Sequence, residues 1–473
     1  MNQKSLMSRL KILLLAFELA SRCQRVISFT SVNEIFVHRY PFTCKHQYLQ
    51  HDYHRESKKT MQVTPSSSVG TEEEVRQTTV REVVKIEKYS RLPIWPLWNG
   101  VFIFLISKIP FISYETVASL EDAIGGRVCP MFFPQDDIMS GGSFYTSPFI
   151  LLVHHMHTFH PWDPLRYIQR FFFPEGFPSH PHRGFCTLTY CLHGGMIHRD
   201  SIGTRQDYGA SKDYSTQFLV AGSGILHEEM WDTERDSKQE LFQLWLNLPA
   251  KYKMMQPSIQ LLADRQDSMP TVVDNIIQGR TSCKQSSTLI IAGSYERHQS
   301  NMTLFSNVTI LHVKLFQIPS SFSSDSNGKA AQKSIWRYSL PENYRTVILY
   351  TRSGSINIAG THIPPHHTVF ISQKGEDLIV SLDLRSSHTV FSYPAQVHEP
   401  KIGADFIVLA GEPLINEPVV AQGSFVMNSY EEITQAFQDY EKGLFGVPWK
   451  ETLSDDEWRL HVDTYTSKGR KHY

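Results

Sequence analysis

Short strands separated by glycine-containing turns are the feature that most restricts how this 473-residue chain can fold. From about residue 128 onward, stretches rich in β-branched and aromatic residues alternate with such turns. Two examples are "FCTLTYCLHGGMIHRDS" at residues 185–201 and "QFLVAGSGILHEEM" at residues 217–230, which we interpret as hairpins. Regular short strands of this kind favour a β-barrel or a β-sandwich.

The strand pattern occurs twice along the chain. In "LFQLWLNLP", Phe242, Leu244, Leu246 and Leu248 fall on one face of a strand. A second set of strands begins near Thr303, and both sets place a strand, a tight glycine turn and another strand in similar order. We therefore expect a duplicated barrel unit.

One helix is predicted after the second set of strands. Ser429 and Glu432 have the spacing of a capping box. The helical stripe that follows consists of Ile433, Ala436, Phe437 and Tyr440.

The first ninety residues differ in character from the rest. Up to Lys59 there are ten Lys and Arg residues but four acidic ones, and "LKILLLAFELA" follows a basic start, as in signal or organelle-targeting segments. Residues 53–77 are polar and poor in aromatic side chains, so burial there cannot offset the entropy lost on ordering. We expect a targeting or disordered segment over residues 1–90, with an organelle (plastid-like) destination or, without targeting, the cytoplasm or nucleus.

Residues 92–107, "LPIWPLWNGVFIFLIS", form an uncharged apolar stretch. A spanning helix needs about twenty apolar residues, and Pro93, Pro96 and Gly100 interrupt this one. We expect it to pack on the domain or on a partner. Peripheral contact with a membrane surface is the next alternative, and a true span is the least favoured.

Charge and cysteine content narrow the classes of partner and site. The formal net charge of −1 provides no overall attraction to nucleic acid or acidic membranes, so direct nucleic-acid binding is not expected. The six cysteines form no C-x-x-C pair, which argues against a zinc finger or a disulfide scaffold. Cys186 and Cys191 should face opposite sides of one strand and should not form a bridge.

The stretch "GFPSHPHRGF" carries the first half of a predicted metal site. In an extended segment residues i and i+2 point to the same side, and Pro181 biases His180 away from helical geometry. His180 and His182 can therefore converge on one point.

The second half lies in "GILHEEM", where His227 and Glu229 again stand at i and i+2 after a glycine turn. Glu228 alternates to the other side and is excluded. Two neighbouring strands would thus aim three imidazoles and one carboxylate at a single ion. Such a set, with positions left for water or substrate, suits Fe(II), Mn, Ni or Cu better than a closed structural zinc site, although zinc stays an alternative.

Two other histidine groups lack this pattern. "LVHHMHTFH" contains His155 and His157 at i and i+2, with His154 and His160 nearby, but no second pair is left for it, so we interpret it as a polar strand edge or pocket wall. In the second half of the chain, "THIPPHHTV" holds three histidines that form no paired face: His362, His366 and His367. We expect the second barrel to bind no metal.

Several long motifs resemble the pirin family of bicupins. They are "EGFPSHPHRGFCTLTYCLHGGMIHRDSIG", "AGSGILHEEM", "LFQLWLNLPAKYKMMQP" and "AGEPLINEPVVAQGSFVMNSYEEI", and the resemblance runs from about Gly125 to Trp449. It implies an all-β fold of two cupin-type barrels with a short C-terminal helix, and one iron, Fe(II) or Fe(III), in the N-terminal barrel. The family's ligands fall on His180, His182, His227 and Glu229.

The chain departs from the family pattern at two places. Cys186 stands where pirins usually have a glutamate that is not a metal ligand, so metal binding should survive while either the polarity of the pocket or its redox behaviour differs. The stretch before Glu115 has no counterpart in short pirins. The predicted division is therefore 1–90 N-terminal segment, 91–115 apolar extension, 116–262 metal-binding barrel, 263–450 metal-free barrel and 451–473 polar tail.

Two functions remain open. The first is an iron-binding, redox-responsive regulator that binds a transcription factor, as the family's nuclear members suggest. The alternative is a metal-dependent dioxygenase that cleaves flavonol-like, quercetin-type polyphenols with O₂, in which Glu229 accepts the substrate's hydroxyl proton. In either case we expect a monomer.

Overall fold

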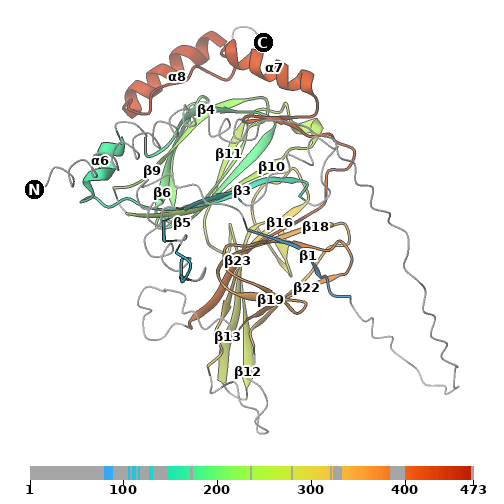
Figure 1. Cartoon of the computed structure of the whole chain (residues 1–473). Coiled ribbons are helices and arrows are strands. Elements are labelled where there is room, and N and C mark those ends of the chain that lie inside the picture. The colour runs from blue at the N-terminus through green and yellow to red at the C-terminus, as the bar shows by residue number, and fades with distance from the viewer. Residues whose placement is uncertain are drawn as a thin grey trace, which may run out of the picture. The chain divides into compact units, whose positions relative to one another are not determined.

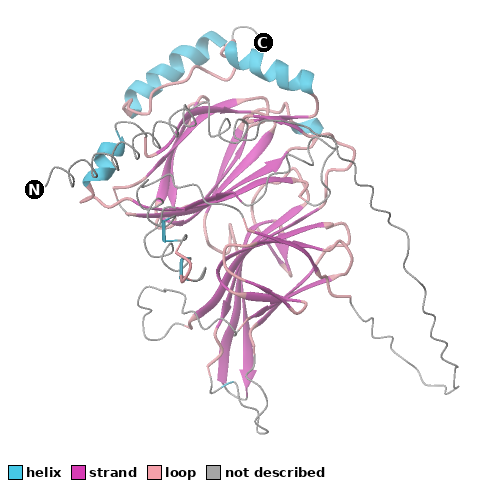
Figure 2. Cartoon of the chain, viewed as in Figure 1, coloured by secondary structure: helices cyan, strands magenta, loops and turns pink. Residues whose placement is uncertain are grey.

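The structure is a computed structural model, and the part of the chain that it describes comprises residues 79–88, 105–106, 109–112, 116–117, 127–130, 146–170, 174–234, 237–278, 281–319, 322, 333–383 and 400–469. The chain divides into Met1–Thr78 and the compact unit Thr79–Tyr473. Only the second unit contains described residues. It is built almost entirely of strands (Figure 2).

The N-terminal barrel consists of two facing antiparallel sheets (Figure 1). The first has the order β11-β8-β5-β10-β3-β2, with the bounds β2 Arg127–Pro130, β3 Phe149–Thr158, β5 Phe185–His193, β8 Thr216–Val220, β10 Lys238–Asn247 and β11 Ser258–Leu262. The second has the order β4-β9-β6-β7, with β4 Gly176–His182, β6 Gly195–Asp200, β7 Arg205–Gly209 and β9 Ile225–Trp231.

The C-terminal barrel repeats this plan. Its larger sheet has the order β1-β21-β18-β23-β16-β13-β12, with β1 Val83–Glu87, β12 Thr271–Gln278, β13 Thr281–Ala292, β16 Val308–Phe316, β18 Thr346–Gly354, β21 Thr368–Ile371 and β23 Ile402–Gly411. Its smaller sheet has the order β17-β22-β19-β20, with β17 Ile335–Ser339, β19 Ile356–Ile358, β20 Thr361–Ile363 and β22 Asp377–Leu382. The predicted all-β fold of two cupin-type barrels is confirmed.

Short elements complete the fold. They are the pairs β14 Ser294–Tyr295 with β15 His298–Gln299 and β24 Val420–Gln422 with β25 Phe425–Met427, the 3₁₀ turn Ala250–Tyr252, and the helices α6 Pro164–Arg170, α7 Tyr430–Glu441 and α8 Asp455–Gly469. Helix α7 begins with the predicted capping box, because the Ser429 hydroxyl accepts from the Glu432 amide and the Glu432 carboxylate accepts from the Ser429 amide.

The interpretation of two glycine turns as hairpins was wrong. The strands on either side of Gly194, β5 and β6, belong to different sheets, and so do β8 and β9 on either side of Gly222. Each turn carries the chain across the barrel from one sheet to the other. Turn chemistry alone does not distinguish such a crossing from a hairpin, because both need a residue with positive φ.

Two segments outside the predicted barrels are folded. Strand β1 lies inside the expected N-terminal segment, yet it pairs antiparallel with β21, so that segment ends before residue 83 rather than at 90. Helix α8 occupies the expected polar tail and buries Trp458 and Val462. The sequence does indicate where α8 begins, because Ser454 and Glu457 form a second capping box.

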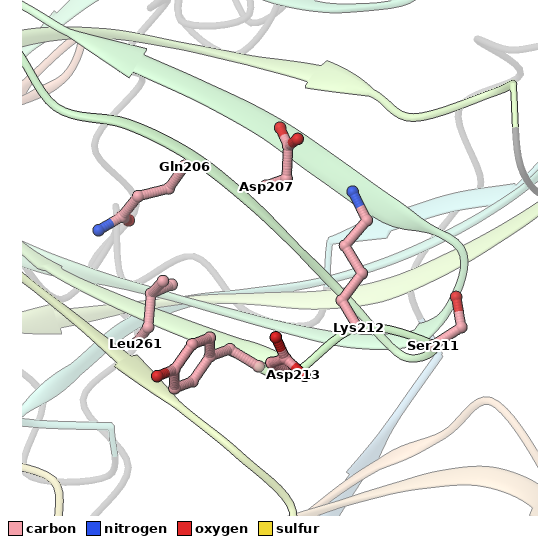
Figure 3. A pocket seen from close by; sticks show the side chains of 7 residues that line it. Gln206, Asp207, Ser211, Lys212, Asp213 and Leu261 are labelled. Atoms are coloured by element: carbon pink, nitrogen blue, oxygen red, sulfur yellow. The ribbon is translucent and has the colours of Figure 1, made fainter.

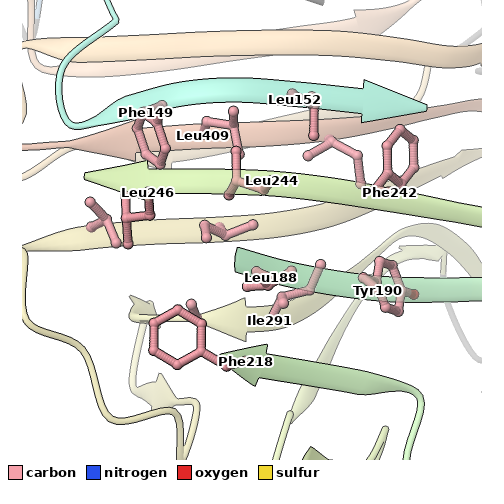
Figure 4. Packing of buried hydrophobic residues seen from close by; sticks show 14 of the residues in the cluster. Phe149, Leu152, Leu188, Tyr190, Phe218, Phe242, Leu244, Leu246, Ile291 and Leu409 are labelled. Atoms are coloured by element: carbon pink, nitrogen blue, oxygen red, sulfur yellow. The ribbon is translucent and has the colours of Figure 1, made fainter. Parts of the chain in front are cut away.

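The two barrels share one hydrophobic core (Figure 4). The predicted apolar face of β10, Phe242, Leu244, Leu246 and Leu248, lies in this core. Side chains of the C-terminal barrel such as Ile291 and Leu409 pack in the same cluster. Cys186 also lies there, whereas Cys191 lies in a separate cluster inside the N-terminal barrel, and both thiols are free.

A buried ion network also joins the barrels. Arg352 of β18 donates two hydrogen bonds to Glu240 of β10, at 2.7 and 2.9 Å, and one to Asp405 of β23, at 3.1 Å. His154 bonds Glu240 at 2.9 Å, and His312 bonds Asp405 at 2.8 Å. Burial would raise the pKa of the Glu240 carboxyl, but Arg352 and His154 outweigh burial and hold it well below its ordinary value.

Of the apolar stretch 92–107, only Leu105 and Ile106 lie within the described residues. Within the described part of the chain, no helix has the length and apolarity needed to cross a bilayer.

Candidate metal centre

Strands β4 and β9 are neighbours and bring the predicted pairs together. His180 lies opposite His227 in the register between them, and His182 follows two residues along β4. One ring nitrogen from each of His180, His182 and His227 lies within 4.8 Å of those of the other two. The three imidazoles that the spacing argument pairs therefore lie together, and their role as metal ligands stays a prediction.

Glycines shape the two turns that bound these strands. Gly184, with φ +83°, follows β4, and a Cβ there would lie 2.1 Å from the carbonyl oxygen of Val426. Gly224, with φ +131°, precedes β9, and a Cβ there would lie 2.3 Å from the ring of Phe445. Both turns therefore need glycine for their backbone angle and for the close approach of the C-terminal segment.

The three imidazoles fit a metal ion. The Nε2 atoms of His180 and His227 lie 3.0 Å apart. Two imidazole nitrogens bound at about 2.1 Å in adjacent octahedral positions would be about 3.0 Å apart, and about 3.4 Å apart in a tetrahedral site. Among the described residues, the buried Nδ1 atom of His227 has no hydrogen-bond partner.

Burial opposes protonation of these imidazoles. It lowers the pKa of His180, and it lowers the pKa values of His182 and His227 well below the ordinary value, with the neighbouring histidines adding to the effect for His182 and His227. A neutral imidazole is the form that binds metals. Burial therefore leaves the ring nitrogens available as metal ligands, because it opposes their protonation.

Glu229 lies on the same side of β9 as His227 but is held by other groups. Its Oε1 accepts hydrogen bonds from Tyr208 at 2.7 Å and Thr189 at 3.1 Å, and its Oε2 accepts from Gln243 at 2.9 Å. It is not among the three side chains that meet at the cluster. Its role as the fourth ligand stays a prediction.

Glu228 faces the opposite side of β9, as the alternation predicts. Its carboxylate pairs with Arg199 of β6. Arg199 in turn donates to the Leu453 carbonyl at 2.7 Å and lies over the ring of Trp458. Through Arg199 the outer face of the metal-site strand contacts the segment that leads into α8.

The same segment also holds β4. Arg183, directly after His182, donates to Asp439 of α7 at 2.8 Å and stacks over Phe445. Leu226, beside His227, packs in a cluster with Phe445 and Trp458. The C-terminal helices therefore cover the outer side of both strands that carry the histidines.

The histidines set aside in the sequence analysis lie elsewhere. His155 and His157 are buried inside the N-terminal barrel, where they contact Trp231 and each other, so the expected pocket wall fits better than a strand edge. His362 pairs with Asp383 at 2.7 Å in the C-terminal barrel.

A further pair was missed. His198 and Asp200 of β6 stand at i and i+2 on the inner side, with Nε2 of His198 3.0 Å from Asp200 Oδ2. The ring of His198 lies 5.5 Å from that of His227. The H-x-D pattern in "MIHRDS" could have identified this pair by the same spacing argument that found H-x-H.

The two barrels differ in what fills them. The interior of the C-terminal barrel is an apolar cluster that includes Leu311, Trp336, Ile356 and Phe406. The N-terminal barrel instead holds three groups of polar side chains, all buried except the half-buried His180 and Gln243: His155 with His157; His180, His182, His198 and His227; and Glu229 with Thr189, Tyr208 and Gln243. Polar groups are costly to bury, so this interior indicates a functional site.

A surface hollow of about 390 Å³ lies at one edge of the N-terminal barrel (Figure 3). Its lining includes Gln206, Lys212 and Leu261. Gln206 is paired with His198 across β6 and β7 and bonds Gln217 of the other sheet at 2.9 Å. The hollow therefore lies one strand away from His198.

Comparison with known proteins agrees with the fold and motifs. Two family models match, one described as pirin over residues 139–246 and one described as the pirin C-terminal cupin domain over residues 330–446. A "putative quercetin 2,3-dioxygenase" of Pseudomonas aeruginosa is 34% identical over 279 residues, which cover 58% of this chain and 81% of that protein. Pirin of Homo sapiens is 31% identical over 291 residues, 60% of this chain and 83% of the human protein.

A solved structure supports the architecture. A quercetin 2,3-dioxygenase from Acinetobacter baumannii superimposes with a TM-score of 0.53 at 23% identity, covering 78% of this chain and 99% of that one. At this identity the likeness concerns the fold alone. From the two family models and the extent of the matches to pirin and its relatives, this chain belongs to the pirin family of bicupins.

Proposed function

We propose that the chain binds one iron ion at His180, His182 and His227, with Glu229 as the fourth ligand, and acts as an O₂-dependent dioxygenase on flavonol-like polyphenols. The observation that carries the proposal is the polar interior of one barrel around three imidazoles whose ring nitrogens meet. The relatives described as putative quercetin 2,3-dioxygenases support the substrate class.

The ion, when bound, would supply Lewis acidity and one-electron chemistry. The protein's contribution is orientation and proton handling. A carboxylate has about four acceptor sites, and Tyr208, Thr189 and Gln243 occupy three of those on Glu229. Glu229 therefore keeps one site, in a fixed direction, for a ligand bond or for the hydroxyl proton of a substrate.

Aromatic side chains enclose the cluster on one side. Phe185 and Trp245 pack on the ring of His182, at centroid distances of 5.0 and 5.5 Å. They exclude water there and hold the imidazole in place. The planar ring of a polyphenol could therefore stack on aromatic side chains in this barrel.

The test combines metal analysis with an aerobic screen. Purified protein loaded with iron is incubated with quercetin and other flavonols while O₂ uptake and flavonol absorbance are followed. We expect stoichiometric consumption of both, and loss of consumption together with iron in the His182→Ala protein. Full iron content without O₂ uptake on any flavonol would refute the dioxygenase proposal while leaving the metal site intact.

A second candidate is a redox-responsive regulator that binds a transcription factor. The observation that favours it is the contact of both histidine-bearing strands with the C-terminal helices, through Arg183 on α7 and Arg199 near α8. A change of metal charge would act on these strands directly. Hydrogen exchange in α8 that differs between Fe(II) and Fe(III) protein would support this candidate, and identical exchange would count against it.

A further inference from the structure

The pair His198 and Asp200 inside the N-terminal barrel is not used by the metal cluster. Both side chains are fully buried, and within the described residues the Nδ1 atom of His198 has no hydrogen-bond partner. An unpaired buried ring nitrogen is costly unless something binds it. We propose that His198 Nδ1 is a hydrogen-bond acceptor for the hydroxyl group of a ligand bound at the metal centre, which makes His198 a specificity-determining residue. The inference rests on the proposed function and narrows its substrate class to phenols and enols that keep a hydroxyl proton.

The location of His198 supports this role. It lies opposite Glu229 on β9 and opposite Gln206 on β7, so the three side chains form one row across the inner face of the sheet. Side chains paired in this way are about 5 Å apart at Cβ. The row ends at Glu229 on β9, two residues from His227, and the ring of His198 lies 5.5 Å from that of His227. A molecule bound beside His227 and Glu229 would therefore lie within reach of His198, and the hollow at Gln206 lies at the other end of the row.

Asp200 determines which nitrogen of His198 carries the hydrogen. Asp200 Oδ1 accepts from the amides of Ile202 and Thr204, each at 2.9 Å, which leaves Oδ2 for His198 Nε2. A carboxylate accepts hydrogen bonds, so Nε2 carries the hydrogen, and in the neutral ring that we propose Nδ1 presents a lone pair. A ligand group that donates a hydrogen bond can therefore bind at Nδ1, whereas a group that only accepts hydrogen bonds is repelled there.

Replacing one carboxylate oxygen of Asp200 by an amide nitrogen should exchange the donor and acceptor roles of the two ring nitrogens of His198. In Asp200→Asn, the amide oxygen is retained by the two backbone N–H donors, because turning the amide would place NH₂ against them. The amide nitrogen must then donate to His198 Nε2, and the ring hydrogen moves to Nδ1. The variant keeps the shape of the site but converts Nδ1 from an acceptor into a donor.

Two small molecules of equal size test whether His198 Nδ1 accepts or donates a hydrogen bond. Phenol carries a hydroxyl donor, whereas pyridine N-oxide has the same number of heavy atoms and can only accept. Dissociation constants are measured by ligand-detected NMR on the full chain, with and without zinc, which is diamagnetic. Since a single hydrogen bond changes affinity by roughly threefold to tenfold, gain of one and loss of the other should shift the ratio of the two constants by about tenfold or more.

We expect wild-type protein to prefer phenol, Asp200→Asn to shift the preference toward pyridine N-oxide, and His198→Phe to lose the preference without reversing it. The matched control is Asp456→Asn, which makes the same charge change at an exposed position of α8 and should leave the ratio unchanged. A ratio in Asp200→Asn within twofold of wild type would overturn the inference. Failure to take up zinc would instead refute the proposed metal site, since the ratio is also measured without metal.

Discussion

Replacing Arg352 by methionine should weaken the contact between the barrels more than any surface substitution. The change keeps the length of the side chain and removes its charge. It leaves Glu240, which has no exposed surface, and Asp405, which has almost none, without the cation that bonds both. Removing one partner of a buried ion pair leaves the other charge buried without full compensation, which costs free energy.

The magnitude follows from the contacts. A pair of unit charges about 4 Å apart at an effective dielectric constant of 20 interacts by about 4 kcal/mol. Arg352 makes one such pair with each carboxylate, but its own desolvation is relieved when it is removed. His154 and Lys238 remain beside Glu240, and His312 remains beside Asp405. We expect a net loss of about 3 to 5 kcal/mol in the free energy of unfolding, a large share of the 5 to 15 kcal/mol typical of a folded domain.

Urea denaturation followed by tryptophan fluorescence measures this loss. Arg345→Met is the matched control, because Arg345 is exposed on the same barrel and should change stability by less than about 0.5 kcal/mol. In the double mutant with Glu240→Gln, part of the loss should be recovered, since one stranded charge is gone. A loss below 1 kcal/mol for Arg352→Met, or no recovery in the double mutant, would refute the reasoning.

Further outcomes can be checked on the same protein. Because the pKa of Glu240 is held well below 4.5, its contribution to stability is fully present above that pH and should be lost as the pH falls further, which acid titration of the unfolding transition measures. His182→Ala should lower iron affinity by at least the tenfold to hundredfold seen for outer-sphere changes, whereas Glu228→Ala should retain iron, as measured by metal analysis; equal loss in both would be contradictory. Changing His366 and His367 together to alanine should leave the metal content unchanged, and a drop by half would reveal a second site. Truncation after residue 450 should lower the melting temperature, since it removes buried Trp458, and an unchanged melting temperature would show that α8 adds no stability.

Short-range spacing predicted the parts of the site that lie within one strand. The i and i+2 rule brought His180 and His182 to one side, and the register between β4 and β9 then added His227. The same rule excluded Glu228. What spacing could not provide was the depth of each side chain in the barrel, which decides that Glu229 is held by Tyr208 and Gln243.

Long-range pairing was the harder part. The glycine turns were found, but whether a turn returns to its own sheet or crosses to the other depends on which face is buried, and that is known only once both sheets exist. Strand β1 was missed for a related reason. Its five residues, VVKIE, do not alternate between apolar and polar, because an edge strand buries little of either face, and its partner β21 lies almost three hundred residues away.

The cover of the histidine-bearing strands has a consequence for synthesis of the protein. Strand β9 ends at Trp231, whereas the helices that cover its outer side begin at Tyr430, after the whole C-terminal barrel. While the ribosome makes that barrel, Leu226 and Glu228 of the nascent chain still lack Trp458 and the segment that anchors Arg199. The first barrel to emerge is therefore completed late, and the strands that carry the metal-site histidines gain their full support only when α7 and α8 have left the exit tunnel.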